Sequence, residues 1–281
     1  MTGPPTAPPT ASTTGPLTGR TALVTGAGNG LGRAMAISLG AAGARVVLVG
    51  RRREALTETA EGASPSDGLA GGVGAELAGG QFRVEPCDVS EPASVADLAG
   101  RVSDEDISIL VNNAGVPGPV ADLVDIEPAE WDAVFGVNVR GVYLMCRAFL
   151  PPMVTAGAGD IVNVASVSGK RPLARRTPYC ASKMAVIGLT TTLAAEVGTH
   201  GIRVNTLSPG PVRGPRMERN FRLEAERTGV ASAQAEHAFV SRAALGRMVE
   251  EPEVGQALVA MLQMPGLTAA DIDLSAGMAA R

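Results

Sequence analysis

The stretch Thr21-Ala22-Leu23-Val24-Thr25-Gly26-Ala27-Gly28-Asn29-Gly30-Leu31-Gly32 decides the fold. Its first five residues are apolar or β-branched and predict a short buried strand. The glycine-rich turn leads into a helix at 33–39, which Gly43 ends, and a second strand follows at 45–49. Glycines between a strand and a helix let the backbone approach a pyrophosphate, and the helix N-terminus adds N–H donors. The sequence therefore predicts a βαβ unit that binds a dinucleotide.

A second group of residues suits proton transfer. Tyr179 and Lys183 are four positions apart, so on a helix they lie on one face. A cation beside a phenol favours the phenolate and lowers the phenol's pKa from its ordinary value of about 10, which suits general acid–base catalysis on a carbonyl or alcohol oxygen. Ser166, thirteen positions before Tyr179, offers a hydroxyl to hold that oxygen. Taken alone, the pair also fits an exposed tyrosine over a solvated lysine.

Together with further motifs, these residues resemble the classical short-chain dehydrogenase/reductase family. The resemblance runs from about residue 19 to residue 277, and every motif occurs in the family's order. The matching residues are Thr25, Gly26, Gly30 and Gly32 of the glycine fingerprint, then Asn112-Asn113-Ala114-Gly115, Asn138, Ser166, Tyr179, Lys183 and Pro209-Gly210. One such motif is a weak indication, whereas the ordered set is specific.

The resemblance implies a catalytic set of Asn138, Ser166, Tyr179 and Lys183. Tyr179 exchanges a proton with the substrate oxygen, which Ser166 hydrogen-bonds. Lys183 also binds the nicotinamide ribose, and Asn138 holds a water that relays protons to it. Taken alone, Asn138 also fits an amide that is satisfied within its helix. The family spacing selects Ser166 rather than Ser168, which we expect to shape the turn.

The same resemblance implies the residues that bind the cofactor. An acid at Asp88 lies beside the adenine ring in the family, and the glycine fingerprint holds the pyrophosphate. The full set is Gly26, Asn29, Gly30, Leu31, Gly32, Arg51, Asp88, Val89, Asn113, Ala114, Gly115, Tyr179, Lys183, Pro209, Gly210 and Val212.

The end of the second strand bears on the choice of cofactor. Family members that prefer NAD(H) typically carry Asp or Glu at the position of Gly50, where the acid accepts hydrogen bonds from the ribose and repels a 2′-phosphate. Gly50 leaves that space open, and Arg51 offers a guanidinium to the phosphate. Alternatively, Arg51, Arg52 and Arg53 simply begin a solvated helix. We predict NADP(H), with NAD(H) as the alternative.

The rest of the chain alternates strands and helices, as a single doubly wound α/β domain of the Rossmann type with a mainly parallel sheet requires. We expect this domain at 19–281, after a disordered Pro- and Thr-rich tail at 1–18. A flexible loop is expected at 62–80 and a substrate lid at about 212–246. Further strands are predicted at 81–84, 107–111, 161–165, 202–207 and 271–274, and helices at 92–102, 128–154, 177–198 and 251–262.

Composition argues against several other classes of protein. A net charge of −4 and only 3% aromatic residues do not fit a nucleic-acid-binding face. Cys87, Cys146 and Cys180 are scattered and neither histidine has ligand-spaced neighbours, so we predict no metal site. The N-terminus lacks a basic start and an apolar core, and the most apolar stretch, 34–50, carries polar residues. We therefore expect a cytoplasmic protein with neither a signal peptide nor a membrane span.

Clusters of basic residues bear on the substrate. The cations in question are Lys170, Arg171, Arg175 and Arg176 before the tyrosine, and Arg213, Arg216, Arg219 and Arg222 at the start of the lid. Guanidinium groups favour carboxylate or phosphate partners, so we expect an anionic substrate such as a 3-oxoacyl thioester or an oxo- or hydroxy-acid. The alternative is that these arginines pair with Glu218, Glu224 and Glu226 or lie at a subunit interface.

The expected function is hydride transfer between a nicotinamide cofactor and a carbonyl or secondary alcohol, with Tyr179 as the general acid or base. One version is a 3-oxoacyl thioester reductase; a non-catalytic dinucleotide-binding sensor is the alternative of another class. By resemblance, the helices carrying Asn138 and Tyr179 pack against their copies in a homo-oligomer, a tetramer or a dimer.

The sequence departs from the family pattern at two places. Gly214 stands where the family often has a Thr that helps hold the nicotinamide carboxamide. Residues 268–270 lack the family's Thr-Gly-Gln, which bears on assembly.

Overall fold

A computed structural model describes residues 15–62, 81–171 and 173–278. In this part of the chain one parallel sheet has the strand order β3-β2-β1-β4-β5-β6-β7. The strands are β1 (Thr21–Thr25), β2 (Arg45–Gly50), β3 (Phe82–Pro86), β4 (Ile107–Asn112), β5 (Gly159–Val164), β6 (Ile202–Pro209) and β7 (Asp271–Leu274). The order reverses between β1 and β4, and such a reversal opens a crevice at the carboxyl ends of the strands. The predicted doubly wound fold is confirmed.

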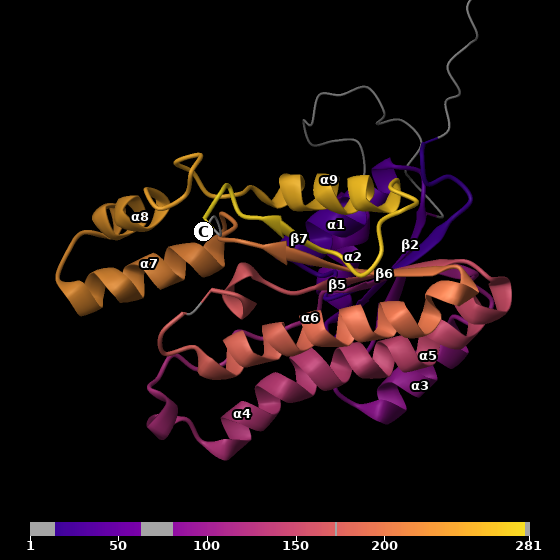
Figure 1. The fold of residues 1–281 in the computed structure, drawn as a ribbon, viewed down its shortest axis with the longest axis horizontal. Helices are drawn as coiled ribbons and strands as arrows, with labels where there is room; N and C mark the ends of the chain where they lie inside the picture. The colour runs from indigo at the N-terminus through magenta and orange to yellow at the C-terminus, as the bar shows by residue number, and fades with distance from the viewer. Residues whose placement is uncertain (1–14, 63–80, 172, 279–281) are drawn as a thin grey trace, which may run out of the picture.

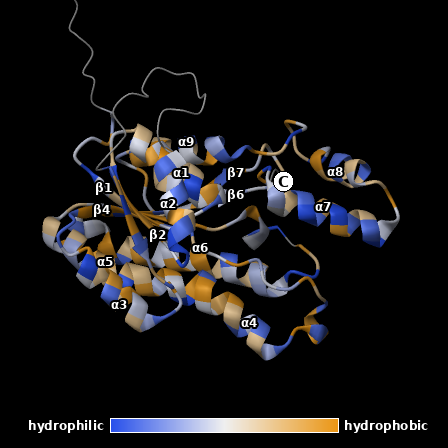
Figure 2. Ribbon diagram, turned by 180° about the vertical axis from the view of Figure 1, so that it is seen from behind, coloured by the Kyte–Doolittle hydropathy of each residue, from blue (hydrophilic) through white to orange (hydrophobic). Residues whose placement is uncertain are grey.

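Helices cover both faces of the sheet (Figure 1). One face carries α1 (Gly30–Ala41), α2 (Arg53–Gly62) and α9 (Glu251–Leu262). The other carries α3 (Pro92–Arg101), α5 (Gly141–Ala156) and α6 (Thr177–Val197), with α4 (Pro128–Phe135) leading into α5. Strands buried on both faces need apolar residues at every position, which is why they read as continuous apolar runs. Neighbours along β1 illustrate this, because Leu23 belongs to one core and Val24 to the other. Figure 2 shows the hydrophobic colour along the strands between the two layers of helices.

The predicted start of the domain needs one correction. Leu17 is 2% exposed, and its N–H donates to the carbonyl of Ala42 at 2.8 Å. Its apolar side chain packs into the core between α1 and the sheet, so residues 15–18 belong to the domain and not to the tail. Residues 1–14 of the predicted tail, and 63–80 of the predicted loop, lie outside the described residues.

The helix predicted at 128–154 is interrupted. Between α4 and α5 the chain makes one π-helical turn, Gly136–Arg140, in which the N–H of Gly141 donates to the carbonyl of Gly136, five residues back. This wider turn carries Asn138. By length and apolar content alone, Pro128–Ala156 could cross a membrane. In this fold it is a core helix, because Met145 and Phe149 are buried against the sheet.

The predicted lid segment folds into two helices that project past the carboxyl edge of the sheet (Figure 1). They are α7 (Pro215–Thr228) and α8 (Ser232–Val240). Phe221 and Phe239 join them in an edge-to-face contact with 5.6 Å between ring centroids. The ends of the segment meet, since Val212 and Val249 form an isolated parallel bridge.

Away from the carboxyl edge of the sheet, the buried carboxylate of Asp160 joins several strands. Asp160, on β5, receives Arg20 from the start of β1 and Arg203 from β6, each at 2.7 Å. Arg20 also donates to the carbonyl of Ser108 on β4, and Arg203 to that of Leu262 at the end of α9. Because Asp160 is buried, its loss leaves two guanidinium groups without their shared anion.

We therefore expect Asp160→Ala to lower the free energy of unfolding by about 2 kcal/mol, less than for a fully buried pair because both arginines are partly exposed. Urea denaturation measures this. Asp104→Ala is the matched control, since Asp104 is an exposed carboxylate on Arg83 and its loss should leave stability nearly unchanged. Equal effects of the two substitutions would contradict the role given to Asp160.

Candidate active site

A cleft of about 2100 Å³ opens at the carboxyl edge of the sheet, where the strand order reverses. Its walls come from the glycine-rich loop after β1, the loops after β2 to β6, and the lid helices. With two exceptions, Asn138 and Lys183, every residue that the sequence nominated for catalysis or cofactor binding lines this cleft.

The glycine-rich loop has the backbone that the sequence predicts. Gly26 has φ +68°, a left-handed conformation that favours glycine. A β-carbon on Gly32 would lie 2.1 Å from the carbonyl oxygen of Gly26, so only glycine allows this close approach. Helix α1 begins at Gly30, and its N-cap, Asn29, makes no side-chain capping bond. The first N–H groups of α1 therefore remain available to an anion.

The loop after β4 is fastened to the end of β1. The hydroxyl of Thr25 accepts hydrogen bonds from the N–H groups of Asn113 and Ala114, at 2.9 and 3.0 Å. The side-chain amide of Asn113 returns a bond to the carbonyl of Thr25 at 2.9 Å. These bonds hold the two loops on either side of the strand-order reversal, so Asn113, Ala114 and Gly115 face the cleft beside the glycines.

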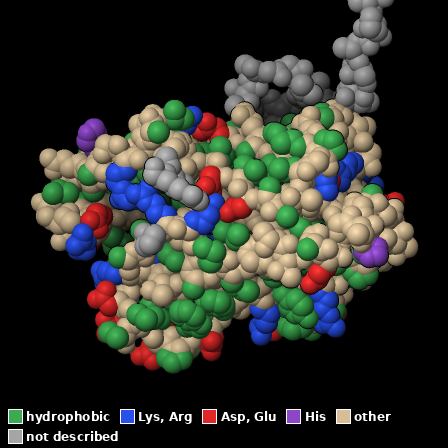
Figure 3. Space-filling view, in the orientation of Figure 1, with side chains coloured by type: hydrophobic (Ala, Val, Ile, Leu, Met, Phe, Trp, Pro, Cys, Tyr) green, Lys and Arg blue, Asp and Glu red, His purple; other side chains and the backbone are tan. Residues whose placement is uncertain are grey.

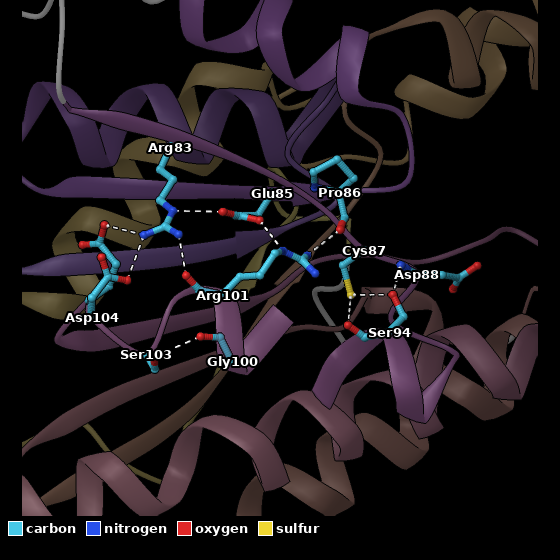
Figure 4. A network of polar contacts seen from close by, with 11 residues as sticks. Arg83, Glu85, Pro86, Cys87, Asp88, Ser94, Gly100, Arg101, Ser103 and Asp104 are labelled. Carbon is cyan, nitrogen blue, oxygen red and sulfur yellow. Dashed lines mark hydrogen bonds and ion pairs between the residues drawn. The ribbon is translucent and has the colours of Figure 1, made fainter. Parts of the chain in front are cut away.

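The predicted adenine end lies after β2 and β3. Arg51, Asp88 and Val89 line it. Burial tends to raise the pKa of Asp88, but the hydroxyl and N–H of Ser90 and the charge of Arg51 outweigh it and hold that pKa below its usual value. Figure 4 shows how the strand is held: Arg101 contacts Glu85 and the Pro86 carbonyl, and the Asp88 N–H donates to the Ser94 hydroxyl.

Ser166 and Tyr179 face the other half of the cleft. Ser166 comes shortly after β5, and its hydroxyl accepts a hydrogen bond from the N–H of Ser168 at 3.1 Å. That bond closes the short turn Val167–Gly169, which is the part we expected Ser168 to play. Tyr179 lies in the first turn of α6 and is 9% exposed.

Lys183 lies one helical turn further along, behind the cleft wall. Its ammonium donates to the carbonyl of Val164 at 2.8 Å and lies 5.9 Å from the centroid of the Tyr179 ring. A β-carbon on Gly115 would lie 3.5 Å from Nζ. The predicted pairing of Tyr179 and Lys183 on one helix face is therefore present, and the solvated-lysine alternative does not hold because Lys183 is buried.

The side chain of Asn138 joins two elements behind the cleft wall. Its side-chain oxygen accepts from the N–H of Val116 at 2.8 Å, and its amide donates to the carbonyl of Val116 and to the hydroxyl of Ser182, both at 3.0 Å. The amide thus fastens the loop after β4 to α6. It does not satisfy its own helix, so that alternative does not hold. The water relay that the resemblance implies stays a prediction.

Glu251 is a site residue that the sequence did not indicate. Pro209, Gly210 and Val212 line the cleft as predicted, and Glu251, at the start of α9, lies among them. A β-carbon on Gly30 would lie 3.7 Å from Glu251 Oε1, and one on Gly214 only 3.3 Å from it. An acid in the first turn of a helix is commonplace, so no signal in the sequence distinguished this one.

The carboxyl of Glu251 lies near Gly30, at the start of α1, where the sequence predicts the cofactor's diphosphate. Burial raises its pKa; Arg33 opposes the rise and Glu250 adds to it. Because the carboxyl lies at the N-terminus of α1, it takes up space and positive potential that a phosphate would use.

The nominated cations divide into two groups. Arg171, Arg175, Arg176 and Arg213 line the cleft, whereas Lys170, Arg219 and Arg222 do not. Lys170 instead contacts Asp271 and Asp273 on β7. The side chain of Arg216 is outside the described residues. Figure 3 shows basic side chains gathered between the lid and the body.

Comparison with known proteins places the chain in a family. The family model for short chain dehydrogenases matches residues 20–226, and the chain belongs to this family. A D-threitol dehydrogenase of Mycolicibacterium smegmatis is 41% identical over 192 residues, which are 68% of this chain and 69% of that protein.

Solved structures agree in fold. A polyketide ketoreductase for actinorhodin, with NADPH, has a TM-score of 0.84 at 29% identity and covers 93% of this chain and 98% of that one. An NAD+-bound xylitol dehydrogenase has a TM-score of 0.83 at 28% identity, covering 93% and 100%. The family uses NAD(H) or NADP(H). The glycine loop fits the diphosphate of either cofactor, and a side chain at Gly32 would prevent the loop from closing in this way.

We expect the position of Glu251 to make cofactor affinity depend on pH. A bound diphosphate favours the protonated carboxyl, so affinity for NADPH should fall as pH rises through the raised pKa of Glu251. Glu251→Gln should bind NADPH about 5- to 10-fold more tightly above that pKa and lose most of the pH dependence.

Titration calorimetry across pH measures both effects. Glu196→Gln, an exposed substitution on α6, is the control and should follow the unmodified protein. If Glu251→Gln keeps the original pH dependence, the carboxyl does not face the diphosphate.

Proposed function

We propose that the protein is an NADP(H)-preferring oxidoreductase that interconverts a carbonyl and a secondary alcohol, with Tyr179 as the general acid or base. One observation carries the proposal: Ser166 and Tyr179 line the same cleft as the glycine loop, with the Lys183 ammonium behind the tyrosine ring. A bound nicotinamide would supply or accept the hydride.

The residues of the chain would do the rest. In reduction the Tyr179 hydroxyl donates its proton to the substrate oxygen, while the Ser166 hydroxyl donates a hydrogen bond to it. In oxidation the same tyrosine accepts the proton from the alcohol. Lys183 favours the charged form of the phenol in both directions and is close enough to the loop after β4 to reach a ribose hydroxyl.

Removing the proton donor tests this role. Tyr179→Phe should lower turnover by at least about 10²-fold and leave NADPH affinity nearly unchanged, because the ring still packs but has no proton to give. The chain offers a matched control, since its other tyrosine, Tyr143, is half-exposed on α5. Tyr143→Phe should retain activity. Substantial turnover by folded Tyr179→Phe would remove Tyr179 from the mechanism.

The preference for NADP(H) rests on the end of β2. Gly50 puts no acid at the end of β2, and the exposed Arg51 beside it lines the cleft. A guanidinium in this place can pair with a 2′-phosphate. The charge of Arg51 helps to lower the pKa of the Asp88 carboxyl, which supports a cation near the predicted adenine end.

Gly50→Asp should shift the ratio of kcat/KM values toward NAD(H) by about tenfold or more, since the new carboxylate repels a 2′-phosphate. Any side chain here meets the Leu56 side chain at 3.3 Å, a contact that a flexible leucine can relieve. Gly50→Ala adds the β-carbon without the charge and should leave the ratio unchanged. A clear preference of the unmodified protein for NAD(H) would refute the proposal.

The substrate side of the cleft is largely apolar with basic groups at its edge. Its apolar lining includes Val120, Leu173, Met217, Phe221, Val230 and Phe239. Two of the basic groups already have partners, since Arg213 pairs with Glu236 and Glu250, and Arg175 with Asp122. An anionic substrate, such as a 3-oxoacyl thioester, remains a proposal that now rests on fewer arginines. The apolar wall favours a substrate with a sizeable hydrocarbon part.

The remaining expectations stay proposals as well. A non-catalytic sensor would not need Ser166 and Tyr179 on one cleft wall, so we favour catalysis. Assembly into a dimer or tetramer would cover the outer faces of α5 and α6, where Tyr143 and Met184 are about half exposed. A cytoplasmic location is consistent with the three free cysteines of the described residues.

A further inference from the structure

An arginine is buried beside the proposed proton donor. Arg176 is the N-cap residue of α6 and is 8% exposed. Burying a guanidinium is costly unless the group is paired or hydrogen-bonded, so such a group is held in one place. Its Nη2 donates to the carbonyl of Pro117 at 3.1 Å, which fixes the group between α6 and the loop after β4.

The fixed guanidinium lies over the tyrosine. The Cζ of Arg176 is 5.4 Å from the centroid of the Tyr179 ring, slightly closer than the Lys183 ammonium at 5.9 Å. Tyr179 therefore has two buried cations within reach of its ring, one at the N-cap of its helix and one a turn further along that helix. Arg175 is placed differently, since it is exposed and contacts Asp122 at 3.5 Å.

Two cations at this distance act on the charge of the ring. A cation is attracted to the face of a neutral aromatic ring, and more strongly to a phenolate, whose ring carries a full negative charge. The attraction is larger where water is excluded, as it is around these buried side chains. Each cation therefore makes the hydroxyl of Tyr179 easier to deprotonate.

We propose that Arg176 is a positioning residue that, together with Lys183, sets the proton affinity of the Tyr179 hydroxyl. The proposal rests on the proposed function in that Tyr179 is taken as the acid and base of the reaction. The other charged side chains that line the substrate side of the cleft are Arg171, Arg175, Arg213, Glu224, Arg227 and Arg242. They are unchanged in the variants below, so their influence is common to all of them.

The chain allows a direct measurement, because it has only two tyrosines. In a Tyr143→Phe background, the ultraviolet absorbance of the phenolate reports on Tyr179 alone. Adding Arg176→Gln should move this titration upward by about one pH unit or more. Gln keeps a donor for the Pro117 carbonyl, so it removes the charge with the least change in structure.

Turnover gives a second readout with a definite sign. For a ketone and alcohol pair that the enzyme interconverts, Arg176→Gln should shift the acid limb of oxidation and the basic limb of reduction to higher pH by the same amount. A residue that only held the loop would lower both rates without moving the limbs.

Two further variants make the test decisive. Arg176→Lys keeps a cation, so its titration should lie between those of the unmodified protein and Arg176→Gln, and it serves if the glutamine variant fails to fold. Arg219→Met removes an exposed lid arginine outside the cleft lining and should change nothing. An unmoved Tyr179 titration in folded Arg176→Gln, or in Arg176→Lys a shift as large as in Arg176→Gln, would overturn the proposal.

The two proposals fail separately. If the absorbance titration shifts as expected but no ketone or alcohol is turned over, the influence of Arg176 on Tyr179 stands and the proposed function fails. If turnover is present and Tyr179→Phe abolishes it, but the titration does not respond to Arg176, only the inference about Arg176 fails.

Discussion

The hydroxyl of Thr25 is the point on which the site depends. It accepts two N–H groups from the loop after β4 and so joins the loops on either side of the strand-order reversal. A parallel sheet brings the carboxyl ends of its strands to one edge, but it does not fix the loops there. The bonds of Thr25 and Asn113 do so, and they hold the glycine loop and the loop after β4 face to face. The cleft has its shape because this junction is rigid.

A second set of bonds extends that rigidity to the catalytic side. The amide of Asn138 fastens Val116 to Ser182, one residue from Lys183. The Lys183 ammonium is held by the carbonyl of Val164, two residues before Ser166. The segments that carry Ser166 and Tyr179 are thus fastened by Asn138 and Lys183, which lie outside the cleft lining, and such support is what a preorganised site requires.

The local residue pattern and the order of the motifs were enough to predict the strands and the loops that meet at the cleft. The strands β1 and β7 have the predicted limits, and the glycine loop and Tyr179 meet at one cleft. The rest depends on long-range packing. Glu251 faces Gly30 only because α9 packs on α1, and the Asn138 amide finds a partner twenty-two residues away. Arg176 looked like one of several loop cations, and only burial separated it from Arg175. The sequence did not indicate that Leu17 is buried in the core, because the residues around it are rich in Pro and Thr.

The bridge between Val212 and Val249 has a consequence for evolution. Both ends of the lid segment leave the body at neighbouring points, so the segment between them can lengthen, shorten or be exchanged without moving β6 or α9. A change of sequence between Val212 and Val249 leaves the hydrogen bonds of the sheet and the glycines of the loop after β1 in place. A lineage can therefore acquire new substrates by replacing this one segment, while the residues proposed to transfer protons are inherited unchanged.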